Sequence, residues 1–288
     1  MDSASFTSPA KINLFLDIRG KRPDGYHETL TWMQTIDLCD TLTLARSARD
    51  FSTLRSDNSS MPLGKRNLCI KAYEAARAAA GDAVDSVEIS LKKRVPLGSG
   101  LGGGSSNAAS VIKGLNVLFS LGMTDEKMSK IAAGVGTDVP FFIRGGAAVA
   151  SGRGEIISPL PSLPAPIHLV VAKPEASVST GEAYKWVKGY KGERELDREE
   201  TAARIASGDL QYVMDRMFNC FEEIVFGRLP ALAALKSNLL DAGCVKAQMT
   251  GSGSAVFGIC PDEKTARSAA SALSADDDTL FVAACRTI

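Results

Sequence analysis

One run of nine residues constrains this chain more than any other feature. Residues 98–106, the glycine run, read GSGLGGGSS and contain five glycines, three serines and one leucine. Glycine lets backbone N–H groups converge on a ligand without Cβ atoms between them, and the apolar spacing over 105–119 predicts an amphipathic helix directly afterwards. The first N–H groups of a helix lack partners within the helix and carry partial positive charge. The run therefore predicts a phosphate-binding loop rather than a flexible linker.

Three familiar glycine-rich loops fit this run poorly. A Walker A loop requires a lysine where two serines follow Gly104. Gly98-x-Gly100-x-x-Gly103 matches the dinucleotide fingerprint, but the ribose-binding acid expected about 20 residues on has only Asp125 as a loose candidate. The chain has no HRD or DFG sequence, which argues against a protein-kinase loop. A different class of phosphate-binding loop is required.

Composition excludes several classes of protein. The chain has 288 residues, 45% of them hydrophobic, enough for one large domain or two ordinary ones. Lys and Arg number 33, as do Asp and Glu, so we expect neither nucleic acid nor a membrane as partner. Six scattered cysteines and two histidines predict reduced thiols and no metal site made by protein side chains alone. The sequence shows no signal peptide and no long apolar run, so we expect a cytoplasmic enzyme. We also expect a monomer or a weak homodimer.

Apolar periodicity predicts interleaved strands and helices. Strands are predicted at 12–18, 41–45, 86–91, 167–172, 245–249, 255–260 and 280–284. Helices are predicted at 67–80, 105–119, from 124, from a capping box at Ser179 and Glu182, and at 210–226, 229–242 and 262–273. Four prolines within 158–166 argue against a helix or a central strand there. We therefore predict an N-terminal domain over 1–157, a linker over 158–166, and a ferredoxin-like α+β domain over 167–288.

Four separated motifs carry a family resemblance over nearly the whole chain. They are SPAKINLFLDIRGKRPDGYHE near the N-terminus, PLGSGLGGGSSNAA around the glycine run, GTDVPFF at 136–142 and MTGSGSAVFGI at 249–259. Together they resemble the GHMP kinases, the superfamily of galactokinase, homoserine kinase and mevalonate kinase. The resemblance implies an α+β fold of two domains, an N-terminal α/β domain like ribosomal protein S5 and a ferredoxin-like C-terminal domain. It also implies ATP as phosphoryl donor, with Mg²⁺, and a glycine run that wraps the ATP phosphates.

Within the superfamily, PAKINLFL, RPDGYH, the triple glycine 102–104 and GTDVPFF are similar to members that phosphorylate a methylerythritol linked to cytidine diphosphate. The resemblance thus implies a cytidine-diphosphate-linked small-molecule substrate on the non-mevalonate route to isoprenoids, in a bacterial cytoplasm. Two alternatives stay open: a GHMP kinase for another small alcohol such as homoserine or mevalonate, and a nucleotide-binding protein without catalysis. The RPDGYH turn argues against the first, because a substrate without a nucleobase leaves Tyr26 and His27 nothing to recognise.

Two charged residues are candidates for catalysis. From the residues alone, Asp138 before Pro140 is more typical of a helix cap, and Lys11 before an apolar strand is more typical of a solvated charge. The resemblance implies instead that Asp138 accepts or orients the proton of the substrate hydroxyl. It further implies that Lys11 lies beside Asp138, keeps the carboxylate ionised and stabilises developing negative charge. A protein that only binds nucleotides has no need of this pair, so we predict Lys11 and Asp138 as catalytic residues.

The resemblance also assigns a substrate site. Tyr26 would stack on cytosine and His27 would hydrogen-bond its polar edge, although an aromatic residue beside a turn as often packs over the core. Tyr184 is the candidate for the opposite face of the base, and Trp186 competes for that role. Asn13 would bind near the reacting centre. The predicted substrate-binding residues are Asn13, Tyr26, His27, Thr180, Tyr184, Gly251, Ser252 and Gly253.

For ATP, the backbone of the glycine run would hold the phosphates, and Ser105 and Ser106 would add donors or a contact to Mg²⁺. Asn67 and Lys93 are candidates on the adenosine side, although helix capping and a solvated strand end explain them equally well. Residues 251–253 would let the second domain close over the phosphates or the substrate diphosphate. The predicted ATP-binding residues are Pro96, Leu97, Gly98, Ser99, Gly100, Leu101, Gly102, Gly103, Gly104, Ser105, Ser106, Asn67 and Lys93.

Overall fold

The structure, a computed structural model, describes residues 2–49, 51–187, 189 and 194–288. The chain forms two compact units, each discontinuous in sequence. The first comprises Met1–Ala10, Cys39–Leu97 and Gly102–Gly145, and the second comprises Lys11–Leu38, Gly98–Leu101 and Gly146–Ile288. The long strands β1 (Ser3–Lys21) and β2 (His27–Arg46) contribute residues to both units. For that reason no single boundary such as 158–166 divides these units.

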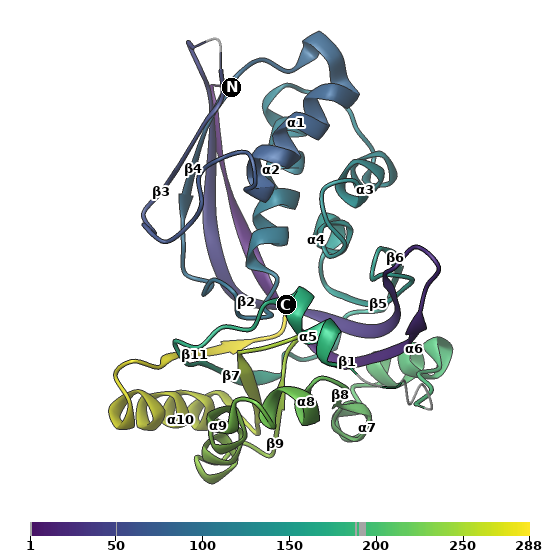
Figure 1. Cartoon of the computed structure of the whole chain (residues 1–288), viewed down its shortest axis with the longest axis vertical. Helices are drawn as coiled ribbons and strands as arrows, with labels where there is room; N and C mark the ends of the chain where they lie inside the picture. The colour runs from purple at the N-terminus through teal and green to yellow at the C-terminus, as the bar shows by residue number, and fades with distance from the viewer. Residues whose placement is uncertain (1, 50, 188, 190–193) are drawn as a thin grey trace. The chain divides into compact units, whose positions relative to one another are not determined.

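The first unit combines a sheet with helices. Strand β3 (Thr53–Ser56) runs parallel to β4 (Val87–Lys92), and β4 pairs antiparallel with residues 41–46 of β2. The helices are α1 (Leu68–Ala80), α2 (Gly103–Leu118), α3 (Asp125–Ala133) and α4 (Val139–Arg144), with a 3-10 turn at Gly81–Ala83. Helix α2 packs against both α1 and α4, as Figure 1 shows.

Helix α2 is buried along most of its length, and its small residues make this possible. A Cβ atom at Gly114 would lie 2.5 Å from Leu44 Cδ1 and 2.9 Å from Phe6 Cε2. Ser110 is also buried, and its hydroxyl accepts a 2.8 Å hydrogen bond from the Ser8 hydroxyl. Such close packing fixes the axis of the helix whose first turn follows the glycine run.

The second unit contains a four-stranded antiparallel sheet in the order β11-β7-β10-β9. Its strands are β7 (His168–Lys173), β9 (Lys246–Met249), β10 (Val256–Cys260) and β11 (Phe281–Arg286). Helices α9 (Pro230–Asp241) and α10 (Glu263–Asp276) pack on this sheet (Figure 1). The strand order and the interleaved helices are those of a ferredoxin-like fold, so the prediction for the second half of the chain is confirmed.

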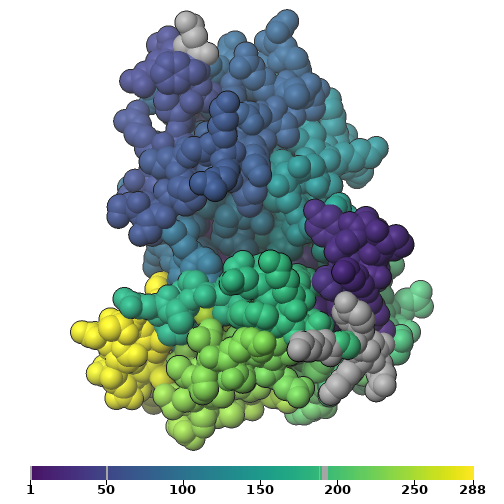
Figure 2. All heavy atoms as spheres, in the orientation of Figure 1, coloured from purple at the N-terminus to yellow at the C-terminus, as the bar shows by residue number. Residues whose placement is uncertain are grey.

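Besides the four-stranded sheet with α9 and α10, the described part of the second unit contains further strands and four further helices. Strand β5 (Ala147–Ser151) pairs with residues 31–34 of β2 and with β6 (Ile156–Pro159), and β8 (Phe218–Asn219) runs parallel to β1. Helices α5 (Thr180–Trp186), α6 (Arg198–Ala206), α7 (Leu210–Arg216) and α8 (Glu222–Phe226) follow along the chain. The turn between β1 and β2 is exposed and forms the dark purple lobe in Figure 2.

The single helix predicted over 210–226 is wrong, because α7 and α8 are separated by β8. Asn219 explains the break. Its Nδ2 donates to the carbonyls of Met249 (2.7 Å) and Gly251 (2.8 Å), and its Oδ1 accepts from the N–H of Phe221 (3.0 Å). These hydrogen bonds of a buried amide outweigh the helix propensity of the segment.

The predicted starts of α1 and α3 are confirmed, whereas α2 begins at Gly103, two residues before the predicted start. Asn67 caps α1 by accepting from the N–H of Cys69 (2.8 Å), and Thr124 caps α3. Ser179 occupies the N-cap position of α5, but its side chain accepts no capping hydrogen bond, so the predicted capping box does not form. Across the described ranges, no helix combines the length and apolar character needed to cross a membrane.

Candidate active site

The backbone of the glycine run has the conformation that its composition predicts. Gly98, Gly100 and Gly102 have φ values of 60°, 78° and 71°, which residues with a Cβ rarely adopt. Helix α2 begins at Gly103, directly after the last of these turns. The glycine run therefore continues directly into the N-terminus of α2, and a glycine-rich loop followed by a helix N-terminus is an arrangement that binds phosphate.

Residues 98–101 of the run belong to the second unit, where they pack against residues 250–255. A Cβ atom at Gly100 would lie 2.2 Å from the carbonyl oxygen of Thr250, and one at Gly251 would lie 3.0 Å from the carbonyl oxygen of Gly100. The N–H of Ala255 donates to the Ser99 carbonyl (3.0 Å). The structure therefore brings together two predicted groups, the first half of the glycine run and Gly251–Gly253, within one unit.

Residues 102–106 belong to the first unit and form the start of α2. A Cβ atom at Gly103 would lie 2.9 Å from Val95 Cγ1, so a side chain is excluded there. The hydroxyl of Ser106 is buried and has no hydrogen-bond partner among the residues that the structure describes. A buried hydroxyl without a partner is costly, and a phosphate oxygen or a cation near the helix N-terminus would satisfy it.

Lys93 is not a solvated strand end, because its side chain is buried. Its ammonium donates to Asp40 Oδ2 and to Asn107 Oδ1 (3.2 Å), and Asp40 also accepts from the N–H groups of Arg94 (2.7 Å) and Val95 (2.8 Å). Asp40 is fully buried, and this cluster anchors the backbone that enters the glycine run. Whether Lys93 also touches adenosine stays a prediction, as it does for Asn67, whose role as a helix cap is confirmed.

Asp40 was missed by the sequence analysis, although the sequence contains a signal for it. It shares the two-residue period of Leu38, Leu42 and Leu44, which places it on the buried face of β2. A charged residue on a buried face requires a partner. That pattern marks an internal ion pair, but it does not identify Lys93 as the partner.

Lys11 is buried, so the solvated-charge interpretation is wrong. Its ammonium donates to Asn13 Oδ1, and Asn13 Nδ2 donates to the hydroxyl of Thr31 (2.8 Å). The N–H of Asn13 also donates to Thr250 Oγ1 (3.0 Å), and the Thr250 hydroxyl donates to Asn13 Oδ1 (3.1 Å). The predicted residues Lys11 and Asn13 are therefore adjacent and held by a buried hydrogen-bond network.

Asp138 precedes α4 and Pro140, as the capping interpretation requires, yet its side chain makes no capping hydrogen bond with the helix. The capping interpretation is therefore wrong. Asp138 belongs to the first unit and Lys11 to the second, and their pairing stays a prediction.

Two of the predicted cytosine-binding rings lie against each other. The His27 and Tyr184 rings are stacked with centroids 4.9 Å apart and an angle of 23°, and Phe221 meets Tyr184 edge-on at 5.1 Å. Burial, with a smaller effect from Lys21, lowers the pKa of His27 below its ordinary value of 6.5. The imidazole is therefore neutral at pH 7 and offers one donor and one acceptor.

Tyr26 does not pack over the core, since 53% of its surface is exposed. The Arg153 guanidinium lies 4.8 Å from the centroid of its ring and is itself paired with Glu155. Tyr184 and Trp186 both pack against the core of the second unit, but Tyr184 stacks on His27, whereas the Trp186 ring lies under the Arg228 guanidinium. These contacts favour Tyr184 as the aromatic partner of His27.

The hydroxyls of Thr180 and Ser252 lie 3.1 Å apart, so two further predicted substrate-binding residues meet in the second unit. Among the described residues, no group of three or more His, Cys, Asp or Glu side chains is placed to hold a metal ion.

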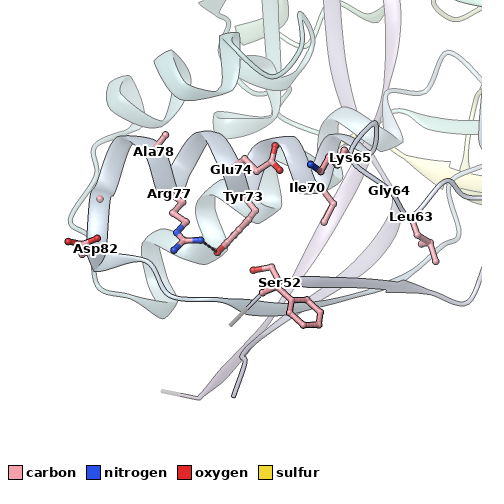
Figure 3. A pocket seen from close by; sticks show the side chains of 12 residues that line it. Ser52, Leu63, Gly64, Lys65, Ile70, Tyr73, Glu74, Arg77, Ala78 and Asp82 are labelled. Atoms are coloured by element: carbon pink, nitrogen blue, oxygen red, sulfur yellow. Dashed lines mark hydrogen bonds between the residues drawn. The ribbon is translucent and has the colours of Figure 1, made fainter. Parts of the chain in front are cut away.

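A pocket of about 730 Å³ lies in the first unit along α1 (Figure 3). Ile70, Tyr73 and Arg77 line it on one stripe of the helix, and Arg77 donates to the Tyr73 hydroxyl (3.4 Å). Leu68, on another face of the same helix, is the residue near Gly104. None of the predicted site residues lines this pocket, so it is separate from the glycine run.

Comparison with known proteins places these features in a family. The profile of the GHMP kinases N terminal domain matches residues 67–146, and that of the GHMP kinases C terminal region matches residues 201–278. Among curated relatives, the 4-diphosphocytidyl-2-C-methyl-D-erythritol kinase of Gloeobacter violaceus is 38% identical and covers 100% of this chain and 95% of its own. The enzyme of the same name from Moorella thermoacetica is 40% identical and covers 95% of both chains.

Solved structures of GHMP kinases are similar to this chain in fold. A crystal structure of 4-(cytidine 5'-diphospho)-2C-methyl-D-erythritol kinase has a TM-score of 0.82, with 34% identity over 99% of each chain. A homoserine kinase from Cytophaga hutchinsonii has a TM-score of 0.76 at 18% identity, over 100% of this chain and 95% of its own. At that identity the second likeness concerns the fold alone.

Proposed function

The chain belongs to the GHMP kinase family, and we propose that it transfers the γ-phosphoryl group of ATP to a hydroxyl of 4-diphosphocytidyl-2-C-methyl-D-erythritol, giving the 2-phosphate and ADP. The observation that carries this proposal is its 38% identity, over the full chain, to a kinase named for that substrate. Such a reaction would place the chain in the non-mevalonate route to isoprenoids. Five of the six cysteines, Cys69, Cys220, Cys244, Cys260 and Cys285, carry free thiols, which supports a reducing, cytoplasmic location. A monomer or weak homodimer stays a prediction.

The glycine run is the proposed site for the ATP triphosphate. Its turns at positive φ expose main-chain N–H groups, and the N-terminus of α2 adds unpaired donors and partial positive charge. The Ser106 hydroxyl, which is buried and has no partner in the described part of the chain, would donate to a phosphate oxygen. The chain has no net positive charge that would attract a phosphate group. These local donors would therefore supply the binding of the negatively charged triphosphate.

The side chains also fit a nucleotide that brings its own Mg²⁺. In phosphoryl transfer this ion is held mainly by the phosphates and needs few protein ligands. Ser105 and Ser106 would be its protein contacts, in keeping with the unsatisfied oxygen of Ser106. When bound, Mg²⁺ neutralises part of the charge on the β- and γ-phosphates.

In the proposed reaction Asp138 accepts the proton of the substrate hydroxyl. The hydroxyl oxygen bonds to the γ-phosphorus while the bond from that phosphorus to the β-γ bridging oxygen breaks. Lys11 favours the ionised form of the carboxylate and stabilises charge on the transferred group. The network through Asn13, Thr31 and Thr250 fixes the direction of the Lys11 ammonium, so its orientation costs little at the moment of reaction.

His27, Tyr26 and Tyr184 are the proposed cytosine site. A neutral imidazole can donate to and accept from the polar edge of cytosine, which carries both an amino group and ring acceptors. The lowered pKa of His27 keeps it in that form at pH 7. Tyr26, backed on one face by Arg153, offers its exposed ring for stacking.

An acceptor comparison tests this function. Purified protein with Mg²⁺ and ATP is given the cytidylyl substrate, homoserine or mevalonate, and ADP formation is followed. We expect turnover with the cytidylyl substrate and none above background with the other two. Turnover with homoserine or mevalonate instead would assign the chain to another GHMP activity, and binding of ATP without turnover of any acceptor would indicate a non-catalytic protein.

A further inference from the structure

Lys173, the last residue of β7, is a buried lysine that the proposed mechanism does not use. Only 6% of its surface is exposed. Its ammonium donates to the carbonyls of Pro174 (2.8 Å), Glu175 (3.5 Å) and Ala176 (3.3 Å), and to the hydroxyl of Ser177 (3.3 Å). The loop 174–177 that follows β7 therefore folds around this one cation.

The partners of Lys173 are unusual for a buried lysine. Buried lysines are rare unless they are paired with a carboxylate. Within the described part of the chain, Lys173 forms no ion pair, and all of its hydrogen bonds go to neutral oxygens. Burial lowers the pKa of Lys173, and the opposing effect of Glu175 is smaller. Among the described residues, the Lys173 ammonium therefore has no carboxylate in direct contact with it.

The loop that Lys173 holds lies against the glycine run. A Cβ atom at Gly98 would lie 3.1 Å from Ser177 Oγ, so the loop and the first turn of the run are in van der Waals contact. The Ala176 carbonyl, which accepts from Lys173, also accepts from the hydroxyl of Ser254. Loop 174–177 therefore contacts both segments that meet at Gly100, the run and residues 250–255.

We propose that Lys173 is a positioning residue for the nucleotide phosphates. It holds loop 174–177 in the shape that supports residues 98–101, and its ammonium, which has no carboxylate in hydrogen-bond contact among the described residues, lies one loop away from the main-chain amides that would bind the triphosphate. This inference rests on the proposed function, because it takes the glycine run to be the phosphate site. A purely structural lysine would instead affect folding, and it would affect all ligands alike.

The test compares nucleotides of increasing charge. Adenosine, ADP and ATP are titrated by calorimetry against the wild type, Lys173→Met and Lys173→Gln. Methionine keeps the length of the buried stem, and glutamine keeps N–H donors for the loop carbonyls without the charge. Lys264→Met, at an exposed position on α10, is the control for the loss of one charge from the whole chain.

We expect both Lys173 variants to weaken ATP binding by about tenfold or more, the scale of a lost charge-assisted hydrogen bond. ADP should lose less than ATP, adenosine should bind unchanged, and Lys264→Met should match the wild type. In turnover assays KM for ATP should rise while KM for the cytidylyl substrate stays the same. Lys173→Arg should recover part of the ATP affinity because it keeps charge and donors.

Equal affinity losses for adenosine and ATP, or no loss for ATP, would overturn the inference. If Lys173→Met does not fold, the glutamine variant decides the matter by the same ratio of ATP to adenosine affinity. Turnover by the wild type is a separate test of the proposed function. If the wild type binds ATP but phosphorylates none of the three acceptors, the proposed function is wrong. The comparison of ATP and adenosine affinities in the variants still decides the role of Lys173.

Discussion

Replacing Gly100 by alanine should lower the free energy of unfolding more than a glycine-to-alanine substitution at an ordinary turn. Gly100 has a φ of 78°, and its Cβ would lie 2.2 Å from the carbonyl oxygen of Thr250 and 3.1 Å from the carbonyl carbon. Real Cβ atoms essentially never come within 3.0 Å of another heavy atom, so one of the two backbones must move by roughly an ångström.

The free-energy cost has two parts. A residue with a Cβ at positive φ costs about 1–2 kcal/mol. Forcing extra volume against packed backbone costs about 1–3 kcal/mol. Together these lower the free energy of unfolding by about 2–5 kcal/mol, a large fraction of the roughly 5–15 kcal/mol typical of a folded protein. If the run moves to relieve the contact, its amides also leave the positions that the phosphates need.

Two glycines in the same chain supply matched controls. Gly122 has a φ of 61° and nothing within 4 Å of its Cβ position, so Gly122→Ala isolates the backbone strain. Gly104 lies in α2 at negative φ with only Leu68 at 3.8 Å, so Gly104→Ala should leave stability unchanged or raise it by about 0.5–1 kcal/mol.

Urea unfolding and ATP kinetics check this prediction. Gly100→Ala should unfold at a clearly lower urea concentration than Gly122→Ala and should raise KM for ATP, whereas Gly122→Ala should leave KM unchanged. Equal unfolding midpoints for the two variants would refute the reasoning, because the contact with Thr250 would then cost nothing.

Other predictions concern the catalytic and cytosine sites. Asp138→Asn should keep the melting temperature and lower kcat by about 10²-fold or more, the scale for losing a positioned base; near-normal turnover would remove this role. His27→Ala should raise KM for the cytidylyl substrate roughly tenfold without changing KM for ATP. The control, Trp186→Phe, should change neither of these KM values. If the wild type and His27→Ala have the same KM for the cytidylyl substrate, the cytosine assignment is contradicted. Because the pKa of His27 is lowered below 6.5, its neutral form predominates above pH 6.5 and is lost as the pH falls through the lowered value. Loss of affinity for the cytidylyl substrate on acidification should therefore have its midpoint below pH 6.5, and a midpoint at or above pH 6.5 would contradict that ionisation state.

The local part of the site could be predicted from sequence because its causes are local. A cluster of glycines followed by an amphipathic pattern specifies turns at positive φ and a helix start, and Gly98, Gly100 and Gly102 have that conformation. The ferredoxin-like order also follows from interleaved periodicities, because short connections and chirality leave few topologies.

The features that could not be predicted depend on residues far apart in the chain. Gly100 must be glycine partly because of Thr250, which stands 150 residues later, and no periodicity encodes that contact. Asn219 breaks a helix that local propensity favours, because its amide bonds the carbonyls of Met249 and Gly251. Lys93 has the local pattern of a solvated charge at a strand end, yet it is buried because it pairs with Asp40 on another strand. In each case a tertiary hydrogen bond or contact overrides the local preference.

The central claim is that this chain moves a phosphoryl group from ATP onto the cytidylyl substrate. Phosphorus NMR of a reaction with Mg²⁺, ATP and 4-diphosphocytidyl-2-C-methyl-D-erythritol follows the phosphorus atom itself. The account predicts a new phosphomonoester signal on the substrate that grows in equal amount with ADP. Release of inorganic phosphate in place of that signal, or an unchanged spectrum with active, folded protein, would contradict it.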